Sequence, residues 1–297
     1  MITFGFLINA ISLGSLYALI SLGLVMIYGV LKMVNFAYGE LIMVGGYGLY
    51  LVGSKFNLPW IFVAAAAILA AMLVSYLTEL VAFRHVREKS LTALLITSFA
   101  VSTLLQNGAL LIISPRAKAV SLPKIFSSSI TFLGITTPAR NILTIAITIL
   151  LLLGLSLLLR RTMLGIALRA ASDNFRMTRM LGIPANLVIS SAFIISGAIA
   201  GVVSLFWVGR TASVTPSIGQ GPLLIAFIAI VVGGISSLEG AVVGGFVYGI
   251  LFSFIGVLLP QTLLDYREAF MFVIVILILL WRPEGLIRVK YAEERVG

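Results

Sequence analysis

The sequence predicts an all-α fold, a polytopic membrane helix bundle of about 8–10 transmembrane helices. Hydrophobic residues make up 61% of the chain, charged residues only 10%, and the mean hydropathy is +1.17. Soluble domains usually have about a quarter of their residues charged. The apolar residues also occur in long stretches broken by short polar intervals, as in chains that cross a bilayer repeatedly.

Nine apolar segments carry this prediction. A helix needs about twenty apolar residues to cross a bilayer, and most of the segments approach that length. The seventh is short and lies between Pro222 and Gly233-Gly234, so it either crosses in a split form or is re-entrant. The segments cover residues 4–30, 36–53, 59–82, 91–113, 141–159, 187–208, 222–235, 240–259 and 267–281.

The basic residues predict the orientation, because cytoplasmic loops carry an excess of Lys and Arg. Of the 20 Lys and Arg, 13 lie on the cytoplasmic side if that side holds Lys32, residues 84–90, residues 160–185 and the end of the chain. With nine crossings, the N-terminus is then outside and the C-terminus cytoplasmic. The first segment is too long for a signal-peptide core, so we expect it to be retained as a helix.

Several kinds of chemistry are disfavoured by composition. The chain has one histidine, His85, and no cysteine, so we predict no metal site and no thiol chemistry. The stretch Gly233–Gly240 has the glycines of a phosphate-binding loop but lacks its Gly-Lys-Ser/Thr ending. If ATP drives this protein, another polypeptide binds it. No nucleophile–base pair and no basic run interleaved with aromatics is evident, so we predict neither an enzyme nor a nucleic-acid-binding protein.

The interval 160–185 is the main candidate for a functional loop. A single acid, Asp173, accompanies five arginines, namely Arg160, Arg161, Arg169, Arg176 and Arg179. Spacings of four, three and four residues place one apolar stripe on a helix, formed by Leu164, Leu168, Ala171 and Phe175. Gly182 and Pro184 are stop signals for that helix. An amphipathic helix at the membrane surface and a solvated loop that only fixes topology both explain this pattern.

Three polar residues are candidates for lining a substrate path. Asn35 and Glu40 lie at the mouth of the second apolar segment, where an acid is costly unless it is satisfied. Glu40 alternatively interacts with the helix dipole in the first turn of that segment. Glu239 has a similar position late in the chain. Glu79, by contrast, lies five residues before Arg84 and is expected to pair near the interface.

Glycines at a spacing of four predict close helix packing. Small residues on one face let two helix backbones approach each other. Packing within the bundle and contact between subunits explain these pairs equally well. The pairs are Gly197 with Gly201, Gly240 with Gly244, and Gly245 with Gly249.

Four sequence strings together resemble one family. They occur in the order Gly14-Ser15-Leu16-Tyr17-Ala18-Leu19, Asn35-Phe36-Ala37-Tyr38-Gly39-Glu40, Gly233-Gly234-Ile235-Ser236-Ser237-Leu238-Glu239-Gly240-Ala241-Val242-Val243-Gly244-Gly245, and Arg282-Pro283-Glu284-Gly285-Leu286. This set resembles the permease subunits of bacterial branched-chain amino acid ABC importers, specifically the LivH-like member of the permease pair. The resemblance extends from about residue 9 to 288.

The resemblance implies one transmembrane permease domain over residues 1–297, with a cytoplasmic coupling loop at about 160–185. It also implies an inner-membrane location, a second similar permease, two cytoplasmic ATPases and a substrate-binding protein on the outer side. This chain itself would bind no cofactor. In the implied mechanism, Leu168 and Phe175 insert into an ATPase groove, while the arginines face acids or lipid phosphates.

Hydrophobic amino acids are the substrate class that the resemblance implies first, with urea and short-chain amides as the runner-up. A self-sufficient channel or an ion-coupled carrier is the alternative from a different class. Proton relays use chains of acids or histidines within the membrane, and no segment carries one.

Overall fold

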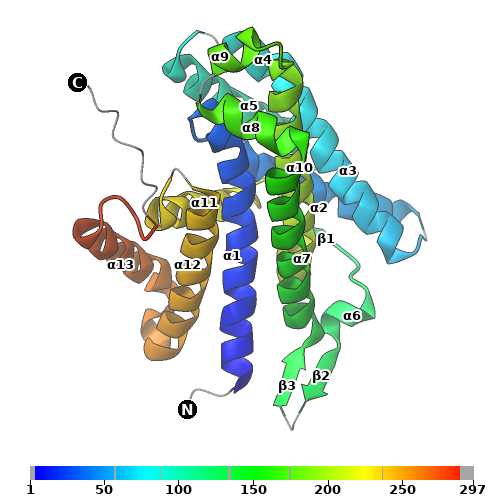
Figure 1. The fold of residues 1–297 in the computed structure, drawn as a ribbon. Helices are drawn as coiled ribbons and strands as arrows, with labels where there is room; N and C mark the ends of the chain where they lie inside the picture. The colour runs from blue at the N-terminus through cyan, green and yellow to red at the C-terminus, as the bar shows by residue number, and fades with distance from the viewer. Residues whose placement is uncertain are drawn as a thin grey trace.

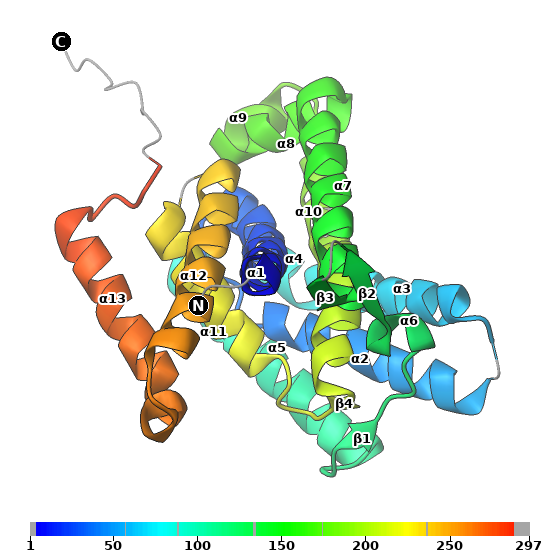
Figure 2. The same ribbon diagram turned by 90° about the horizontal axis from the view of Figure 1, so that it is seen from below.

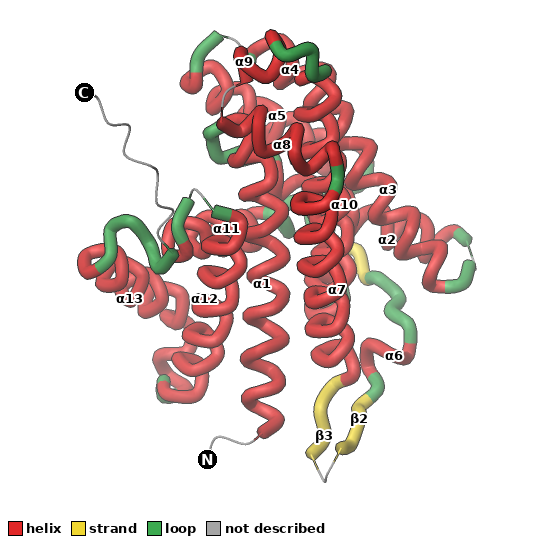
Figure 3. Tube along the Cα trace, viewed as in Figure 1, coloured by secondary structure: helices red, strands yellow, loops and turns green. Residues whose placement is uncertain are grey.

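All nine predicted apolar segments form helices in the computed structural model, which describes residues 4–56, 58–87, 89–132, 135–173, 175–235 and 237–287 (Figures 1 and 3). The all-α prediction is therefore confirmed. The corresponding helices are α1 (Phe4–Leu31), α2 (Tyr38–Lys55), α3 (Trp60–Thr78), α5 (Leu91–Ile112), α7 (Ala139–Arg161), α10 (Ala185–Thr211), α11 (Gln220–Gly233), α12 (Leu238–Leu258) and α13 (Arg267–Trp281).

Six helical stretches in the described part of the chain are long and apolar enough to cross a membrane. They are Gly5–Leu31, Trp60–Val86, Leu91–Ile112, Ala139–Arg161, Asn186–Thr211 and Leu238–Leu258. The other three predicted segments form the shorter helices α2, α11 and α13, of 18, 14 and 15 residues. The segment predicted to be short, between Pro222 and Gly233, is α11.

Helix α1 is the centre of the bundle. The middle of α1 is fully buried, and α12, α10, α11 and α7 all pack against it. Figure 2 shows α12 and α7 on either side of α1. Helix α3 packs on α10 and α2 further out. Large apolar side chains of α3, α5 and α7, such as Leu69, Leu104 and Leu150, are exposed and form the apolar perimeter of the bundle.

Two groups of short elements lie at the two ends of the bundle. At the end that holds the N-terminus, β2 (Ser129–Phe132) and β3 (Ile135–Pro138) form an antiparallel hairpin (Figure 1). At the opposite end lie α4 (Arg84–Val86), α8 (Met163–Asp173) and α9 (Phe175–Met180). The remaining short elements are β1 (Lys118–Ala119), α6 (Lys124–Ser127) and β4 (Ser213–Val214), with β1 and β4 paired, and a 3-10 turn, Gln261–Tyr266.

The predicted glycine pairs make close helix contacts within the chain. A Cβ atom at Gly197 or Gly201 would overlap backbone atoms of α3. Gly240 and Gly244 face the end of α11 in the same way, and Gly245 and Gly249 face Ala18 and Gly14 of α1. Packing inside the bundle, one of the two explanations left open by the sequence, is therefore what the structure contains.

The same contacts bring the quoted sequence strings together in space. The first string lies on α1 opposite Gly245 and Gly249. The last string folds back on the end of α11: the N–H groups of Leu286 and Ile287 donate hydrogen bonds of 2.9 and 3.0 Å to the carbonyl oxygens of Val232 and Gly233. The first, third and last strings thus pack together where α1, α11 and α12 meet.

Candidate functional site

The loop between α7 and α10 contains an amphipathic helix, α8, as the spacing of its apolar residues predicts. Thr162 begins it, because its Oγ1 accepts a hydrogen bond of 3.1 Å from the N–H of Gly165. Gly165 is required here, since a Cβ atom would overlap the last carbonyl oxygens of α7. The chain therefore turns sharply from α7 into α8.

The apolar stripe of α8 faces the chain's own bundle. Leu168 is only 3% exposed and Ala171 is also buried, both in the main hydrophobic cluster around α1. This contradicts the prediction that Leu168 inserts into an ATPase groove: its side chain holds α8 on the bundle. Arg169 strengthens the attachment, because its Nη1 donates a hydrogen bond of 2.5 Å to the Leu159 carbonyl oxygen at the end of α7. Leu164, in the same stripe, is partly exposed.

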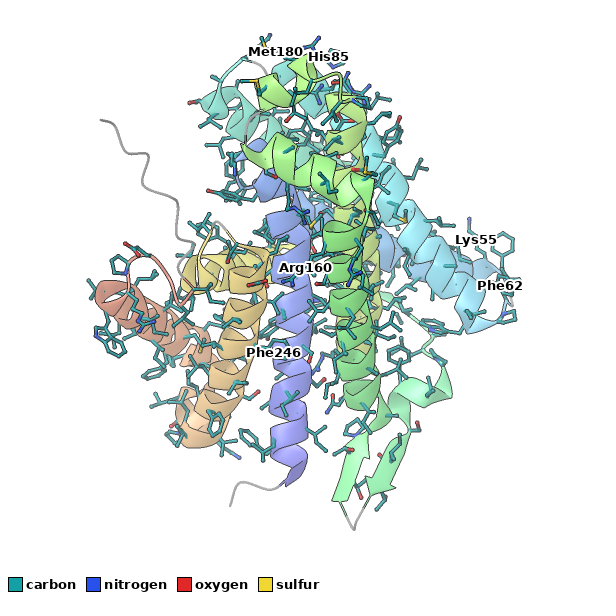
Figure 4. All side chains as sticks on the ribbon, in the orientation of Figure 1. Lys55, Phe62, His85, Arg160, Met180 and Phe246 are labelled. Carbon is teal, nitrogen blue, oxygen red and sulfur yellow. The ribbon has the colours of Figure 1, made fainter. Side chains whose placement is uncertain are left out.

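A second set of apolar side chains in this loop faces outward. Leu181 is 73% exposed and Met180 is 69% exposed, and Met163, Ile166 and Met177 are exposed as well. Figure 4 labels Met180 at the outermost end of the bundle. At Asp173, Phe175 and Arg176 the backbone is helical, and the side chains lie outside the described part of the structure. The exposed residues are thus the available contact surface of the loop.

Gly182 ends α9, as its sequence position predicts. Its φ angle is +80°, a conformation that glycine adopts without strain. The Gly182 N–H donates a hydrogen bond of 3.1 Å to the carbonyl oxygen of Arg179, and Pro184 then precedes α10. The loop therefore has a tight attachment at α7 and a glycine–proline joint at α10.

Asn35 lies in the turn between α1 and α2, Glu40 lies in the first turn of α2, and both are buried. Asn35 has a structural contact, because its Oδ1 accepts a hydrogen bond of 3.0 Å from the N–H of Ala37. Glu40 is 2% exposed, and its Oε1 accepts a hydrogen bond of 3.1 Å from Ser102 of α5. Its Oε2 has no hydrogen-bond partner among the described residues. A buried carboxyl oxygen without a partner is costly, which makes Glu40 the strongest candidate for a polar group in the path.

Glu239 is not part of that cluster. It lies in the first turn of α12 and forms an ion pair with Arg160 at the end of α7, with 2.9 Å between its Oε1 and the arginine Nη2. Both side chains are more than two thirds exposed, at 73% and 68%. The three acids and amides predicted for the path therefore fall in two separate places.

A buried ionic network lies where α3 ends, and sequence reasoning found only part of it. Glu79 pairs with Arg84 at 2.8 Å, as predicted from their spacing, and with Arg87 at 3.4 Å. Residues Glu79–Phe83 form a π-helical turn, in which groups five residues apart come into register. Ser190 of α10 adds a hydrogen bond of 2.7 Å to Glu79. Nothing in the sequence signals this partner, which is 111 residues away.

The fold is that of a polytopic membrane protein: long apolar helices form a bundle around a close-packed centre, and an amphipathic helix lies at one end. The chain matches the family described as "Branched-chain amino acid transport system / permease component" over residues 6–279, and it belongs to that family. The chain is accordingly a transport permease and not an enzyme.

Named relatives cover almost the whole chain. The high-affinity branched-chain amino acid transport system permease protein BraD of Pseudomonas aeruginosa is 32% identical over 95% of this chain and 94% of its own length. LivH of Escherichia coli, with the same description, is 32% identical over 94% and 93%. A probable branched-chain amino acid transport permease protein LivH of Methanocaldococcus jannaschii is 29% identical over 95% and 92%.

Proposed function

We propose that this chain is the permease subunit of a bacterial ABC importer that carries branched-chain or other hydrophobic amino acids across the inner membrane. The observation that carries the proposal is full-length similarity to permeases whose names specify branched-chain amino acids. The sequence has no phosphate-binding loop of its own, which favours ATP hydrolysis by two separate cytoplasmic ATPases. A second similar permease and an extracytoplasmic binding protein complete the proposed assembly.

We place the end of the bundle with α8 and α9 in the cytoplasm, together with the C-terminus. Support comes from the excess of basic residues at residues 84–90 and 160–185. With this orientation the β2–β3 hairpin and the N-terminus lie on the outer side, where a binding protein would dock.

The residues 160–185 act as the coupling loop in this proposal. An ATPase contacts the outward side chains of the loop, among them Met180 and Leu181. Phe175, Arg176 and Arg179 are included in this proposed contact from their positions in the sequence. Because α8 is attached to α7 through Arg169 and packs on α1 through Leu168, force on the loop passes directly into the bundle. Differential binding of the loop by the ATP-bound and ATP-free motor then shifts the permease between its inward and outward forms.

We assign Glu40 to the substrate path, next to Asn35. Its support is the buried carboxyl oxygen without a partner, in a turn that packs between α5 and the start of α11. During transport, movement of these helices would expose the carboxylate to the substrate, whose ammonium group it attracts.

Uptake by the assembled transporter tests the proposed function. The permease is purified with its partner subunits, reconstituted in liposomes with ATP on the ATPase side, and supplied with the binding protein and radiolabelled leucine, isoleucine or valine. We expect ATP-dependent uptake of the labelled amino acid, and we expect that excess urea or acetamide does not inhibit it. Uptake of urea or acetamide instead would establish the amide substrate class. Transport by the lone subunit without ATPases would overturn the importer proposal in favour of a channel or carrier.

A further inference from the structure

An apolar groove runs down one side of the bundle, between α7 and α12. It has a volume of about 490 Å³. Leu22 of α1 forms its floor, while Leu152 and Leu155 of α7 and Val242 and Val243 of α12 form its walls. The helices α7 and α12 each pack on α1, which lies between them (Figure 2). The groove is therefore an opening on the perimeter of the bundle.

The charged groups of the groove gather at one end. Arg160 and Glu239 join the ends of α7 and α12 there, and Arg169 of α8 lies beside them. Arg160 is labelled in Figure 4, and α8 crosses the bundle just beyond it. The next residue along the chain, Arg161, does not line the groove. Two guanidinium groups and one carboxylate leave the mouth with a net positive charge.

Along α7, the groove extends from Arg160 to Leu152, about 12 Å at the helical rise per residue. The groove matches the two parts of a phospholipid. Its charged mouth, at the level of the amphipathic helix, suits the phosphate headgroup, and its apolar trough, which leads toward the middle of the bundle, suits an acyl chain. The exposed ion pair at the mouth is also suited to the headgroup layer, where arginine side chains place their charge while their stems cover apolar surface.

We propose that this groove binds one acyl chain of an anionic glycerophospholipid from the leaflet on the α8 side, with its phosphate on Arg160 and Arg169. Guanidinium groups bind phosphate oxygens in pairs of charge-assisted hydrogen bonds, which favours arginine at such a mouth. The lipid would seal the gap between α7 and α12 and contact the end of α7 to which the coupling loop is attached. The proposal does not depend on which substrate is transported.

Native mass spectrometry of the purified transporter, titrated with palmitoyl-oleoyl-phosphatidylglycerol, tests the site. Substituting Arg160→Gln is expected to weaken lipid binding about tenfold, since a hydrogen bond to a charged group contributes that much. Substituting Glu239→Gln is expected to strengthen binding by about two- to fivefold, because it removes the repelling carboxylate from an exposed site. If the ion pair only held the two helices together, both substitutions would change the affinity for phosphatidylglycerol in the same direction.

Two further variants separate the groove from the surrounding surface. Leu155→Trp fills the trough and keeps both arginines, and it should abolish binding of the acyl chain. Arg161→Gln removes a neighbouring charge that does not line the groove, and it should leave binding unchanged. If Leu155→Trp fails to fold, the opposite effects of Arg160→Gln and Glu239→Gln still decide the proposal.

Three outcomes would overturn it. Equal displacement of the lipid by millimolar inorganic phosphate would indicate a free-anion site. Tighter binding of phosphatidylethanolamine that is lost in Glu239→Gln would indicate recognition of an ammonium headgroup. The third outcome combines two observations: the Leu155→Trp variant no longer retains the second permease, and the wild-type assembly binds no phosphatidylglycerol. Together they would show that a partner helix occupies the groove.

Discussion

Ser190 donates a hydrogen bond of 2.7 Å to Oε2 of Glu79, and this contact joins the end of α3 to the first turns of α10. Glu79 is fully buried, and Arg84 and Arg87 pair with the same carboxylate. Because α10 starts directly after the proposed coupling loop, this network fixes the point at which the chain re-enters the bundle.

Glu79→Gln is expected to destabilise the bundle strongly. It removes the buried negative charge that Arg84 and Arg87 share, and breaking a buried ion pair typically costs about 3–5 kcal/mol. The control is Glu239→Gln, which removes an exposed pair and should cost about 0–1 kcal/mol. Unfolding of the purified subunit in an SDS titration measures both. Similar losses for the two variants would contradict the structural role given to Glu79.

Gly249→Ala is expected to separate α12 from α1. Its new Cβ atom would overlap backbone atoms of Gly14, which cannot rotate away, and overpacking of this kind costs about 1–3 kcal/mol. Gly154→Ala on α7 is the matched control, because no atom lies within 4 Å of the added carbon. The same SDS titration should show a loss for the first variant alone. If Gly249→Ala left the stability of the subunit unchanged, α12 and α1 would pack less closely than described.

Leu181→Glu and Phe175→Glu are expected to reduce both retention of the ATPases during purification and substrate-stimulated ATP hydrolysis. A charge in the apolar contact surface of the loop would be desolvated on docking. Leu181→Glu should not lower the unfolding midpoint of the isolated subunit, because Leu181 is 73% exposed.

Leu168→Ala provides the contrasting result for that loop. Leu168 is buried, so the variant should lose about 2–5 kcal/mol of stability before any docking defect appears. If both glutamate variants retained the ATPases and full ATP hydrolysis, residues 160–185 would not be the coupling loop.

Glu40→Gln is expected to lower the maximal rate of uptake by about tenfold or more, as loss of a charge-assisted contact would. Stability should change little, because the amide oxygen still accepts the hydrogen bond from Ser102. Labelled leucine uptake in the reconstituted transporter measures the rate. Asn107→Ala is the control: it lies on the same helix as Ser102, and its side-chain amide donates a hydrogen bond to the carbonyl oxygen of Thr103 in that helix. Unchanged uptake in Glu40→Gln would remove Glu40 from the path.

The sequence predicted the helices well because membrane spans are long, apolar and bounded by charges. It also predicted α8, but a stripe such as Leu164, Leu168 and Ala171 reads the same whether it faces the chain's own bundle or a partner. The burial of Leu168 decides between these, and burial depends on how α7, α8 and α1 pack. Local spacing could pair Glu79 with Arg84, whereas Ser190 joins them only through the tertiary contact of α3 with α10.

Glu239 shows a second limit of local patterns. Its position before a glycine-rich helix resembles that of Glu40, yet one acid is buried beside α5 and the other is exposed beside α7. Whether an acid at a helix start is desolvated depends on which helices cover it, and that information is not local.

The two glycine pairs of α12 have a consequence for how this permease can diverge. Gly240 with Gly244 and Gly245 with Gly249 are offset by five residues, so their faces are about 140° apart around the helix. Both faces are closed to any larger side chain by neighbouring backbone. Substitutions that enlarge a side chain of α12 are therefore tolerated mainly on the rest of the helix circumference, which includes Glu239 and Val243. Variants of this transporter can alter what their perimeter meets in the bilayer while the centre of the bundle keeps its shape.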